Sequence, residues 1–394
     1  MRTLPFLAGI LSLVVAAAAC ADGTTTPPTT TSPAAPPSSS IATATPTDAP
    51  AHTLGSSPAG ACELPPLAFR AAQLLLAGVP GTEIGPTSRA LVRGGLGGVI
   101  LYGPNLVDAA QVRSLIASLQ AMAEVPLAVA VDEEPGRVAR FATAGILPAT
   151  PTARALGQHS AAFVRSTAAS IGRGLRDLGV TVDLAPVLDV TDAEASGVIG
   201  DRSFGSDPAS VARAGVAFAE GLAAAGVSAV GKHFPGHGES STDSHTSLPT
   251  VTASRATLTR RALPPFVAAV KAGIPAIMLG HLLVPSIDAT LPASLSPKSV
   301  RVLRDDLGFD GLVMTDDLYM GAVAAQWDAG RAAEMAVAAG VDMVILSAGT
   351  GALDVAAALV AAVQEGRLAE ARLTDAFLRV ERFKKVSRWV ACAP

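Results

Sequence analysis

Short apolar runs alternate with longer stretches of helical spacing along most of the chain. The short runs predict eight strands, at 73–78, 98–102, 126–132, 181–186, 228–232, 276–280, 311–315 and 342–346. The longer stretches predict helices between them, at 109–123, 161–178, 209–225, 264–272 and 330–339. Eight strands separated by helices indicate a (β/α)8 barrel of the TIM type, over a single catalytic domain at 62–394. An open doubly wound sheet is the alternative, although no Gly-rich dinucleotide-binding sequence follows an early strand.

The segment that precedes this domain has two parts of different composition. Arg2 and the largely apolar run after it predict a signal peptide at 1–19, too short for a comfortable membrane span. Small residues precede Cys20, as in a bacterial lipobox, so Cys20 is the expected site of lipidation, with ordinary cleavage beside an incidental cysteine as the alternative. Residues 20–61 are dominated by Thr, Pro, Ser and Ala, a composition that predicts a disordered tether. The protein is therefore expected outside the cytoplasmic membrane, attached to it by the lipid alone.

Charge and cysteine content narrow the picture further. The formal net charge is −4 and no basic cluster is present, which argues against a nucleic-acid partner. Two of the three cysteines, Cys62 and Cys392, flank the folded region. In an exported protein they could form one disulfide, or remain as free thiols.

Polar side chains collect where the predicted strands end. The densest group is 232–245, which holds three of the six histidines. Strand-end residues with charged or imidazole side chains are Asp132 and Arg140 (third strand), Asp189 and Arg202 (fourth), Lys232 and His233 (fifth), His281 (sixth), and Asp316 and Asp317 (seventh). The chemistry of α/β barrels lies at the carboxyl ends of the strands, so these side chains are expected to converge on one mouth.

Two of these groups suggest glycoside hydrolysis. Asp316 is placed to act as the nucleophile of a retaining glycosidase, and the neighbouring Asp317 suits a cap of the following turn. The sequence alone only weakly favours Asp316 over Asp317 as the nucleophile. His245 could serve as acid and base because its ordinary pKa is near neutrality, with Asp243 orienting the ring if the loop folds tightly.

A zinc site is the rival interpretation of the His-rich loop. His233, His237 and His245 could be ligands with Asp243 behind them, but the spacing matches no helical His pair. No metal is therefore expected. Arg140, Arg202 and Lys232 are typical donors to hydroxyls or carboxylates.

Four motifs in order resemble the bacterial β-N-acetylhexosaminidases of glycoside hydrolase family 3. They are Asp-Glu-Glu-Pro-Gly-Arg-Val-Ala-Arg (132–140), Gly-Asp-Arg-Ser-Phe-Gly (200–205), Lys-His-Phe-Pro-Gly-His-Gly with Asp-Ser-His (232–238 and 243–245), and Thr-Asp-Asp-Leu (315–318). The resemblance runs from about Leu67 to Phe383. It implies a barrel that removes terminal β-linked N-acetylglucosamine from peptidoglycan fragments, with retention and without a cofactor.

The resemblance also implies a role for each motif residue. Asp316 would be the nucleophile, and His245 the acid/base assisted by Asp243. The sugar would be held by Asp132, Arg140, Arg202, Lys232 and His233. Family members commonly have Gln and Gly where this chain has Glu133 and Pro135, which predicts a slightly different sugar-binding loop.

Two other functions stay open at this point. A histidine acid/base does not repel phosphate as a carboxylate does, so a phosphorylase that releases a sugar 1-phosphate is the nearest rival. A non-catalytic sugar-binding lipoprotein on a degenerate barrel is the alternative from another class. The two Trp and two Tyr residues of the chain argue against a long stacking groove and favour an exo-acting pocket for one sugar.

Overall fold

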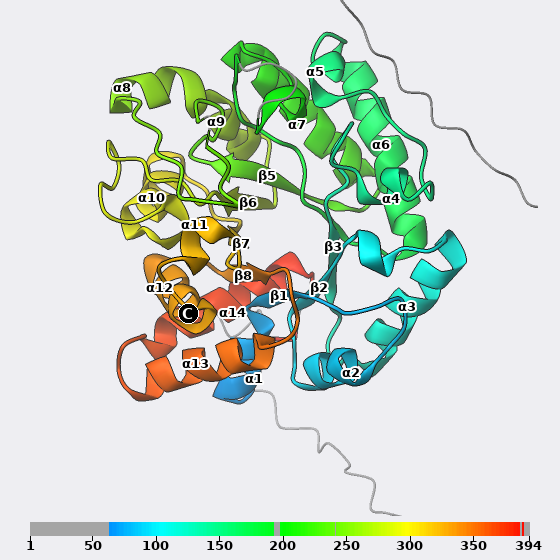
Figure 1. Cartoon of the computed structure of the whole chain (residues 1–394), viewed down its shortest axis with the longest axis vertical. Coiled ribbons are helices and arrows are strands. Elements are labelled where there is room, and N and C mark those ends of the chain that lie inside the picture. Colours follow the sequence, from blue (N-terminus) through cyan, green and yellow to red (C-terminus); the bar gives the residue numbers. More distant parts are fainter. Residues whose placement is uncertain (1–62, 193–197, 241, 387, 390–394) are drawn as a thin grey trace, which may run out of the picture. The chain divides into compact units, whose positions relative to one another are not determined.

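The computed structural model describes residues 63–192, 198–240, 242–386 and 388–389. Their strands pair in parallel in the order β1 to β8, and β8 pairs with β1, which closes a barrel with the helices around it (Figure 1). The strands are β1 (Leu75–Gly78), β2 (Gly98–Leu101), β3 (Ala128–Val131), β4 (Val182–Asp183), β5 (Ser228–Phe234), β6 (Ala276–Leu279), β7 (Leu312–Asp317) and β8 (Met343–Leu346). The predicted (β/α)8 barrel is confirmed.

The predictions for the chain ends cannot be compared with this structure. The predicted signal peptide and tether, and Cys20, Cys62 and Cys392, all lie outside the described residues. None of the described helices is both long enough and apolar enough to cross a membrane.

Several predicted strand boundaries were wrong, and β4, predicted at 181–186, spans only Val182–Asp183. Gln73 ends the first helix, so β1 begins two residues later than predicted. At the other end of the barrel β5 continues to Phe234 and β7 to Asp317. His233 and Asp316 are therefore strand residues beyond the predicted strand ends, because polar side chains that face the mouth interrupt the apolar pattern without ending the strand.

The helices surround the barrel and several are capped by their own sequence. They are α1 (Leu67–Gln73), α2 (Pro86–Arg93), α3 (Ala109–Met122), α4 (Arg140–Thr143), α5 (Ala153–Leu156), α6 (Ala161–Leu178), α7 (Pro208–Ala224), α8 (Arg255–Thr257), α9 (Pro264–Lys271), α10 (Pro297–Arg301), α11 (Gly321–Ala324), α12 (Ala329–Ala339), α13 (Ala352–Gln364) and α14 (Glu370–Phe383). Asp108, for example, caps α3 by accepting hydrogen bonds from the backbone N–H groups of Ala110 and Gln111, both at 2.8 Å. The five predicted helices correspond to α3, α6, α7, α9 and α12.

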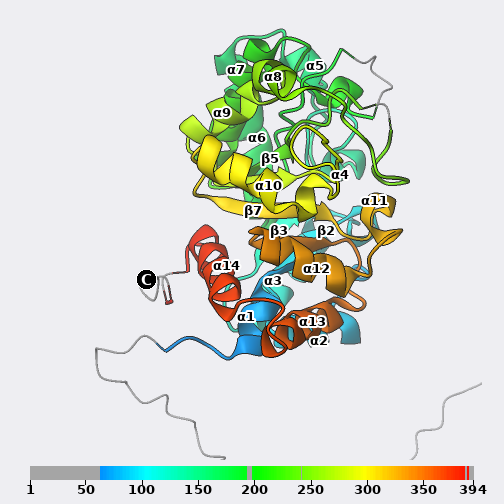
Figure 2. The ribbon, with the colours of Figure 1, turned by 90° about the vertical axis from the view of Figure 1, so that its left-hand side faces the viewer.

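The hydrophobic core has two layers. A large outer layer fills the space between the barrel and its helices. A smaller inner layer fills the barrel itself and includes Leu76, Ile100, Val182, Leu184, Val230, Met278, Leu312, Met314, Ile345 and Val380. Val380 comes from α14, which lies on the opposite side of the barrel from α4 and α11 (Figure 2). The last helix thus contributes to the barrel interior from the end away from the polar residues.

Candidate active site

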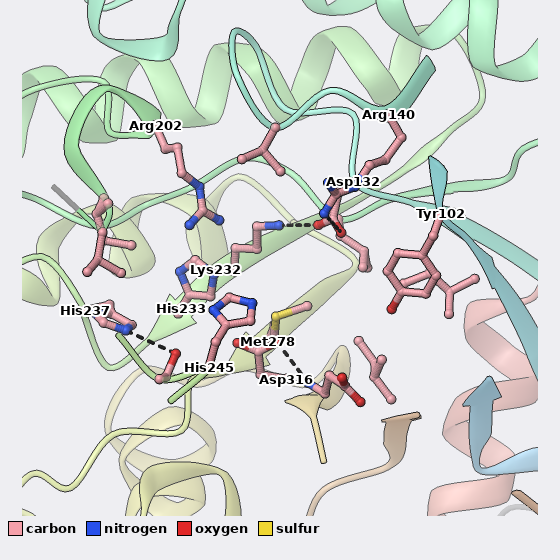
Figure 3. A pocket seen from close by; sticks show the side chains of 18 residues that line it. Tyr102, Asp132, Arg140, Arg202, Lys232, His233, His237, His245, Met278 and Asp316 are labelled. Carbon is pink, nitrogen blue, oxygen red and sulfur yellow. Dashed lines mark hydrogen bonds and ion pairs between the residues drawn. The ribbon is translucent and has the colours of Figure 1, made fainter. Parts of the chain in front are cut away.

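A cavity of about 140 Å³ opens at the carboxyl ends of the strands (Figure 3). Its lining residues are Ile100, Tyr102, Asp132, Val138, Arg140, Leu184, Val198, Ile199, Arg202, Lys232, His233, His237, Ser244, His245, Met278, Asp316, Asp317 and Ile345. All the residues predicted to bind sugar, and both residues predicted for chemistry, line this one space. Asp243 reaches it through His245. The expected convergence of the strand ends is therefore present.

A buried ion network forms one wall of the cavity. The Lys232 ammonium lies 2.7 Å from Asp132 Oδ1 and 2.7 Å from Glu134 Oε1. Arg202 binds the same Glu134 carboxylate through two hydrogen bonds, of 2.8 Å and 2.7 Å. Burial alone would raise the pKa of Glu134, but these two cations lower it well below its usual range. The ionised Glu134 carboxylate thus holds the donors of Lys232 and Arg202 in place.

Glu134 is a site residue that sequence reasoning missed. It is the last of three consecutive acids, 132–134, that follow β3. Nothing in the sequence of these three acids shows which of them pairs with Lys232 or Arg202. Its side chain is only 1% exposed. A carboxylate so buried needs partners, and Arg202 and Lys232 supply them.

The loop that joins Asp132 to Arg140 is a hairpin. Glu134 N donates to Val138 O at 2.8 Å, and the tip holds Pro135 followed by Gly136, whose φ is +92°. A proline followed by a residue with positive φ is the arrangement that a type II turn requires. Pro135 thus fits the tip without loss of a needed donor, and Arg140 Nη2 returns to within 3.6 Å of Asp132 Oδ2.

Asp316 faces the cavity from β7 as a carboxylate. Burial acts to raise its pKa, but His233, His281, the backbone N–H of Asp317 and Lys232 outweigh burial and lower the pKa. The Asp317 N–H bond to Asp316 Oδ1 is 2.8 Å long. The group is ionised at neutral pH, as a nucleophile must be.

The side chain of Asp317 has a backbone-capping role. Its Oδ1 accepts hydrogen bonds from Tyr319 N at 3.2 Å and from Ser347 N at 2.8 Å. These bonds tie the turn after β7 to the end of β8. This geometry agrees with the cap suggested for Asp317 and leaves Asp316 as the acid available for chemistry.

His233 is oriented by a buried carboxylate, Asp189. The His233 Nδ1 atom lies 2.7 Å from Asp189 Oδ2, and His237 N donates to Asp189 Oδ1 at 2.6 Å. Burial would raise the pKa of Asp189, but His233 and His237 together lower it. Because Nδ1 is engaged behind the ring, the Nε2 edge of His233 is left for the cavity. Sequence analysis placed Asp189 at a strand end without assigning this partner.

Asp243 and His245 form the tight pair that the loop was expected to allow. The Asp243 Oδ1 atom accepts from His245 N at 2.9 Å and lies 2.8 Å from His245 Nδ1. The His245 side chain is 71% exposed although it lines the cavity, so it also meets solvent. Slight burial opposes the effect, but the hydrogen bonds from His245 hold the pKa of Asp243 below its ordinary value.

Two further cavity neighbours were not assigned a role from the sequence. The fully buried His281 connects Ser294 Oγ, at 2.7 Å from Nδ1, to the carbonyl oxygen of Asp317, at 2.8 Å from Nε2. Tyr102 points its hydroxyl into the cavity (Figure 3), where burial, and then Asp132, Asp317 and Asp316, raise its pKa. Tyr102 is therefore a neutral donor beside the carboxylates. A tyrosine directly after β2 carried no motif signal.

Metal ligation was the rival interpretation of the histidines. Among the residues that the structure describes, no group of three or more His, Cys, Asp or Glu side chains is placed to hold one ion. His233 instead uses Nδ1 for Asp189, and His245 uses Nδ1 for Asp243.

Comparisons with known proteins show similarity to one family of glycoside hydrolases. The model of the glycosyl hydrolase family 3 N-terminal domain matches residues 70–383. The β-hexosaminidase LpqI of Mycobacterium tuberculosis is 40% identical over 311 residues, which cover 77% of this chain and 78% of that protein. The β-hexosaminidase of Thiobacillus denitrificans is 38% identical over 281 residues, 69% of this chain and 77% of that protein.

Solved structures show the same similarity. A glycoside hydrolase family 3 β-N-acetylglucosaminidase from a Paenibacillus species superposes with a TM-score of 0.79 at 36% identity, covering 84% of this chain. This chain spans 64% of that protein's length. The structure of M. tuberculosis LpqI gives a TM-score of 0.76 at 36% identity and covers 82% of this chain and 94% of that one.

Proposed function

The chain belongs to glycosyl hydrolase family 3, and from this premise we propose that it is a retaining exo-β-N-acetylglucosaminidase. It is thus a glycoside hydrolase, and its substrate is terminal β-N-acetylglucosamine on peptidoglycan fragments. The observation that carries the proposal is one cavity that contains both an ionised acid, Asp316, and a carboxylate-supported histidine, His245. Relatives named β-hexosaminidase support the choice of sugar.

In the first step Asp316 attacks the anomeric carbon of the bound sugar. A carboxylate oxygen forms the new bond to that carbon while the glycosidic carbon–oxygen bond breaks. The imidazolium of His245 gives its proton to the departing oxygen, so the aglycone leaves as a neutral alcohol. Asp243 stabilises the charged ring before the transfer and fixes which nitrogen carries the proton.

In the second step the neutral His245 removes a proton from water. The resulting nucleophile attacks the anomeric carbon from the face that the aglycone left, and the bond to Asp316 breaks. Two inversions give net retention. The exposure of His245 suits this step because water reaches the ring without displacement of the sugar.

The remaining polar residues hold the sugar. Lys232, Arg202 and Arg140 present donors whose positions are set by Asp132 and Glu134, so their side chains need little reordering when hydroxyls bind. His233 adds a ring nitrogen fixed by Asp189. The apolar floor of Ile100, Leu184, Met278 and Ile345 limits depth, which suits a single terminal sugar.

The proposed setting is the cell envelope. A lipid on Cys20 and the tether at 20–61 would hold the barrel outside the cytoplasmic membrane, where wall fragments are its substrates. Palmitate labelling of the wild-type chain and of Cys20→Ala in the producing cell tests the anchor. An unlabelled wild-type chain found in the cytosol contradicts this placement.

The activity is tested by release of 4-nitrophenol from its β-N-acetylglucosaminide. Wild-type protein, Asp316→Ala and His245→Ala are compared, with Asp108→Asn as a control that alters an exposed capping carboxylate elsewhere. Loss of turnover in Asp316→Ala and a large decrease in His245→Ala support both roles. Binding of the sugar by folded wild-type protein without turnover supports the non-catalytic sugar-binding alternative instead.

One feature favours phosphorolysis as a second candidate. His245 bears no negative charge in either protonation state, so phosphate can approach the intermediate without repulsion from the acid/base. The same assay with and without phosphate separates the two reactions. Formation of a sugar 1-phosphate identifies a phosphorylase, whereas unchanged rates and free sugar identify a hydrolase.

A further inference from the structure

We propose that Glu133 is a positioning residue: its ionised carboxylate clamps the hairpin that carries Asp132 and Arg140, and so controls affinity for the sugar. Glu133 is 2% exposed and does not line the cavity. It therefore acts through its neighbours and touches no substrate. This inference rests on the proposed sugar site for its consequence, but not for its geometry.

The clamp consists of two hydrogen bonds across the hairpin. Glu133 Oε2 accepts from Phe141 N at 2.7 Å, and Oε1 accepts from Ala142 N at 2.9 Å. These N–H groups belong to the first turn of α4, which begins at Arg140. Both carboxylate oxygens are therefore used to hold the start of the helix that presents the Arg140 guanidinium.

No local cap replaces these bonds. The residue before α4 is Ala139, whose side chain has no acceptor, so the N–H groups of Phe141 and Ala142 depend on Glu133. Glu133 and Ala139 also pair as an antiparallel bridge, and Arg140 N donates to Asp132 O at 3.1 Å. The clamp and the bridge together set the separation of Asp132 and Arg140.

Three ionisable groups surround the carboxylate. Asp132 lies on its own loop, Arg140 on α4, and the fully buried Asp183 on β4, where Asp183 Oδ1 accepts from Glu133 N at 3.0 Å. On the side of α6, the described residues that line the adjoining cavity are Phe163, Ser166, Thr167, Ser170, Ile171 and Gly174, which carry no charge. The cavity beside Glu133 therefore supplies no counter-charge on the side of α6; Arg140 is the cation that acts on this carboxyl, and Lys232 lies beyond Asp132 and Asp183.

The state of this carboxyl changes near neutral pH. Burial raises the pKa of Glu133 to about 7, in spite of the two backbone N–H groups and Arg140. A protonated carboxyl carries hydrogen on one oxygen, which becomes a donor and a weaker acceptor, so one of the two backbone bonds is weakened. Below pH 7 the clamp therefore loosens on one side, and the Arg140 end of the hairpin is held less firmly.

The affinity of the site then follows the ionised fraction of Glu133. If the sugar binds only when Glu133 is ionised, the apparent dissociation constant equals the intrinsic one divided by the ionised fraction of Glu133. One pH unit below the pKa this amounts to a weakening of about 10-fold. Glu133→Gln has a single acceptor oxygen at every pH, so it should bind weakly and without this pH dependence.

The first measurement is the dissociation constant of N-acetylglucosamine by titration calorimetry at pH 6 and pH 8. We expect the wild type and the Asp108→Asn control to weaken about 10-fold at pH 6. Glu133→Gln should give the weak value at both pH values, with an unchanged circular dichroism spectrum. A Glu133→Gln protein that keeps the wild-type pH dependence overturns the inference. The inference also fails if Asp183→Asn loses the pH dependence while Glu133→Gln retains it, because Asp183 would then be the titrating group.

A second measurement is independent of the ligand. Amide hydrogen exchange over residues 141–142, corrected for intrinsic rates, reports directly on the two clamped N–H groups. We expect lower protection in Glu133→Gln than in wild type at pH 8, and no difference over α3. Equal protection in both proteins refutes the clamp, even where no sugar binds. Failure of N-acetylglucosamine to bind at any pH, with the difference in protection present, refutes the proposed substrate and leaves the clamp intact.

Discussion

Replacement of Asp189 by Asn tests the support of His233 most directly. The fully buried Asp189 side chain accepts from His237 N at 2.6 Å, engages His233 Nδ1 at 2.7 Å and lies 3.3 Å from His233 N. An amide of the same shape keeps one acceptor oxygen and places an NH2 group where the second acceptor was. It cannot satisfy His237 N and a protonated Nδ1 together, so His233 must change tautomer or turn.

The size of the effect follows from the bond that is lost. A hydrogen bond with a charged partner contributes about 1.5–3 kcal/mol, so loss of one such bond at Asp189 should lower the free energy of unfolding by about 2 kcal/mol. If the same bond orients His233 toward the sugar, a transition-state loss of that size reduces kcat/KM by about 30-fold. The folded-state pKa of Asp189 lies below its ordinary value, so its contribution to stability is present above pH 4 and disappears as the pH falls through the folded-state pKa.

The assay combines kcat/KM for the 4-nitrophenyl β-N-acetylglucosaminide with urea unfolding at pH 7 and pH 4. We expect Asp189→Asn to be slower and less stable than wild type at pH 7, with most of the stability difference still present at pH 4, because that difference is lost only as the pH falls from the ordinary pKa toward the lowered folded-state pKa. Asp108→Asn, which changes an exposed carboxylate that also caps backbone N–H groups, controls for loss of charge. Wild-type kcat/KM in a folded Asp189→Asn protein refutes the orienting role.

Three further substitutions have distinct expected results. Tyr102→Phe removes only a hydroxyl that faces the cavity, so kcat/KM should fall up to about 10-fold while the melting temperature stays unchanged; an equal loss of stability contradicts a substrate contact. Lys232→Met leaves Glu134 and Asp132 short of a buried cation, which should cost about 3 kcal/mol in urea unfolding, against under about 1 kcal/mol for Lys298→Met, whose lysine is 54% exposed and lies 3.5 Å from its partner Asp288. Glu133 has a raised pKa of about 7, so between pH 4.5 and 7 the folded state binds more protons than the unfolded state. The free energy of unfolding of the wild type should therefore decrease by about 3 kcal/mol as the pH rises from 4.5 to 7. Glu133→Gln should show a flatter profile in chemical denaturation.

The barrel could be predicted because its strands are buried on both faces. Such strands appear as continuous apolar runs, as in 276–279 and 343–346, and the helices between them have a different period. Strand ends at the mouth could not be predicted in the same way. His233 continues β5 beyond the predicted end at Lys232 although it is polar, because its side chain binds Asp189 in the mouth rather than packing in the core.

The candidate site was predictable as a set of residues but not as a set of pairs. Motif positions such as Lys232 and Asp316 stand beside Gly and Pro in recognisable order. Asp189 and Glu134 acquire partners 44 and 68 residues away, and such distant contacts leave no periodic signal in the chain. Glu133 was visible only as a departure from the family pattern, because its bonds go to backbone groups that every residue possesses.

The apolar floor of the cavity has a consequence for how the proposed glycosidase turns over. Ile100, Leu184, Met278 and Ile345 belong to the packed barrel interior, and Val380 of α14 belongs to the same layer. The cleaved sugar cannot continue through the barrel, so it must leave through the opening by which the next chain end enters. Hydrolysis is then distributive: the enzyme releases its glycan after every cut, and free N-acetylglucosamine competes with substrate for the same entrance.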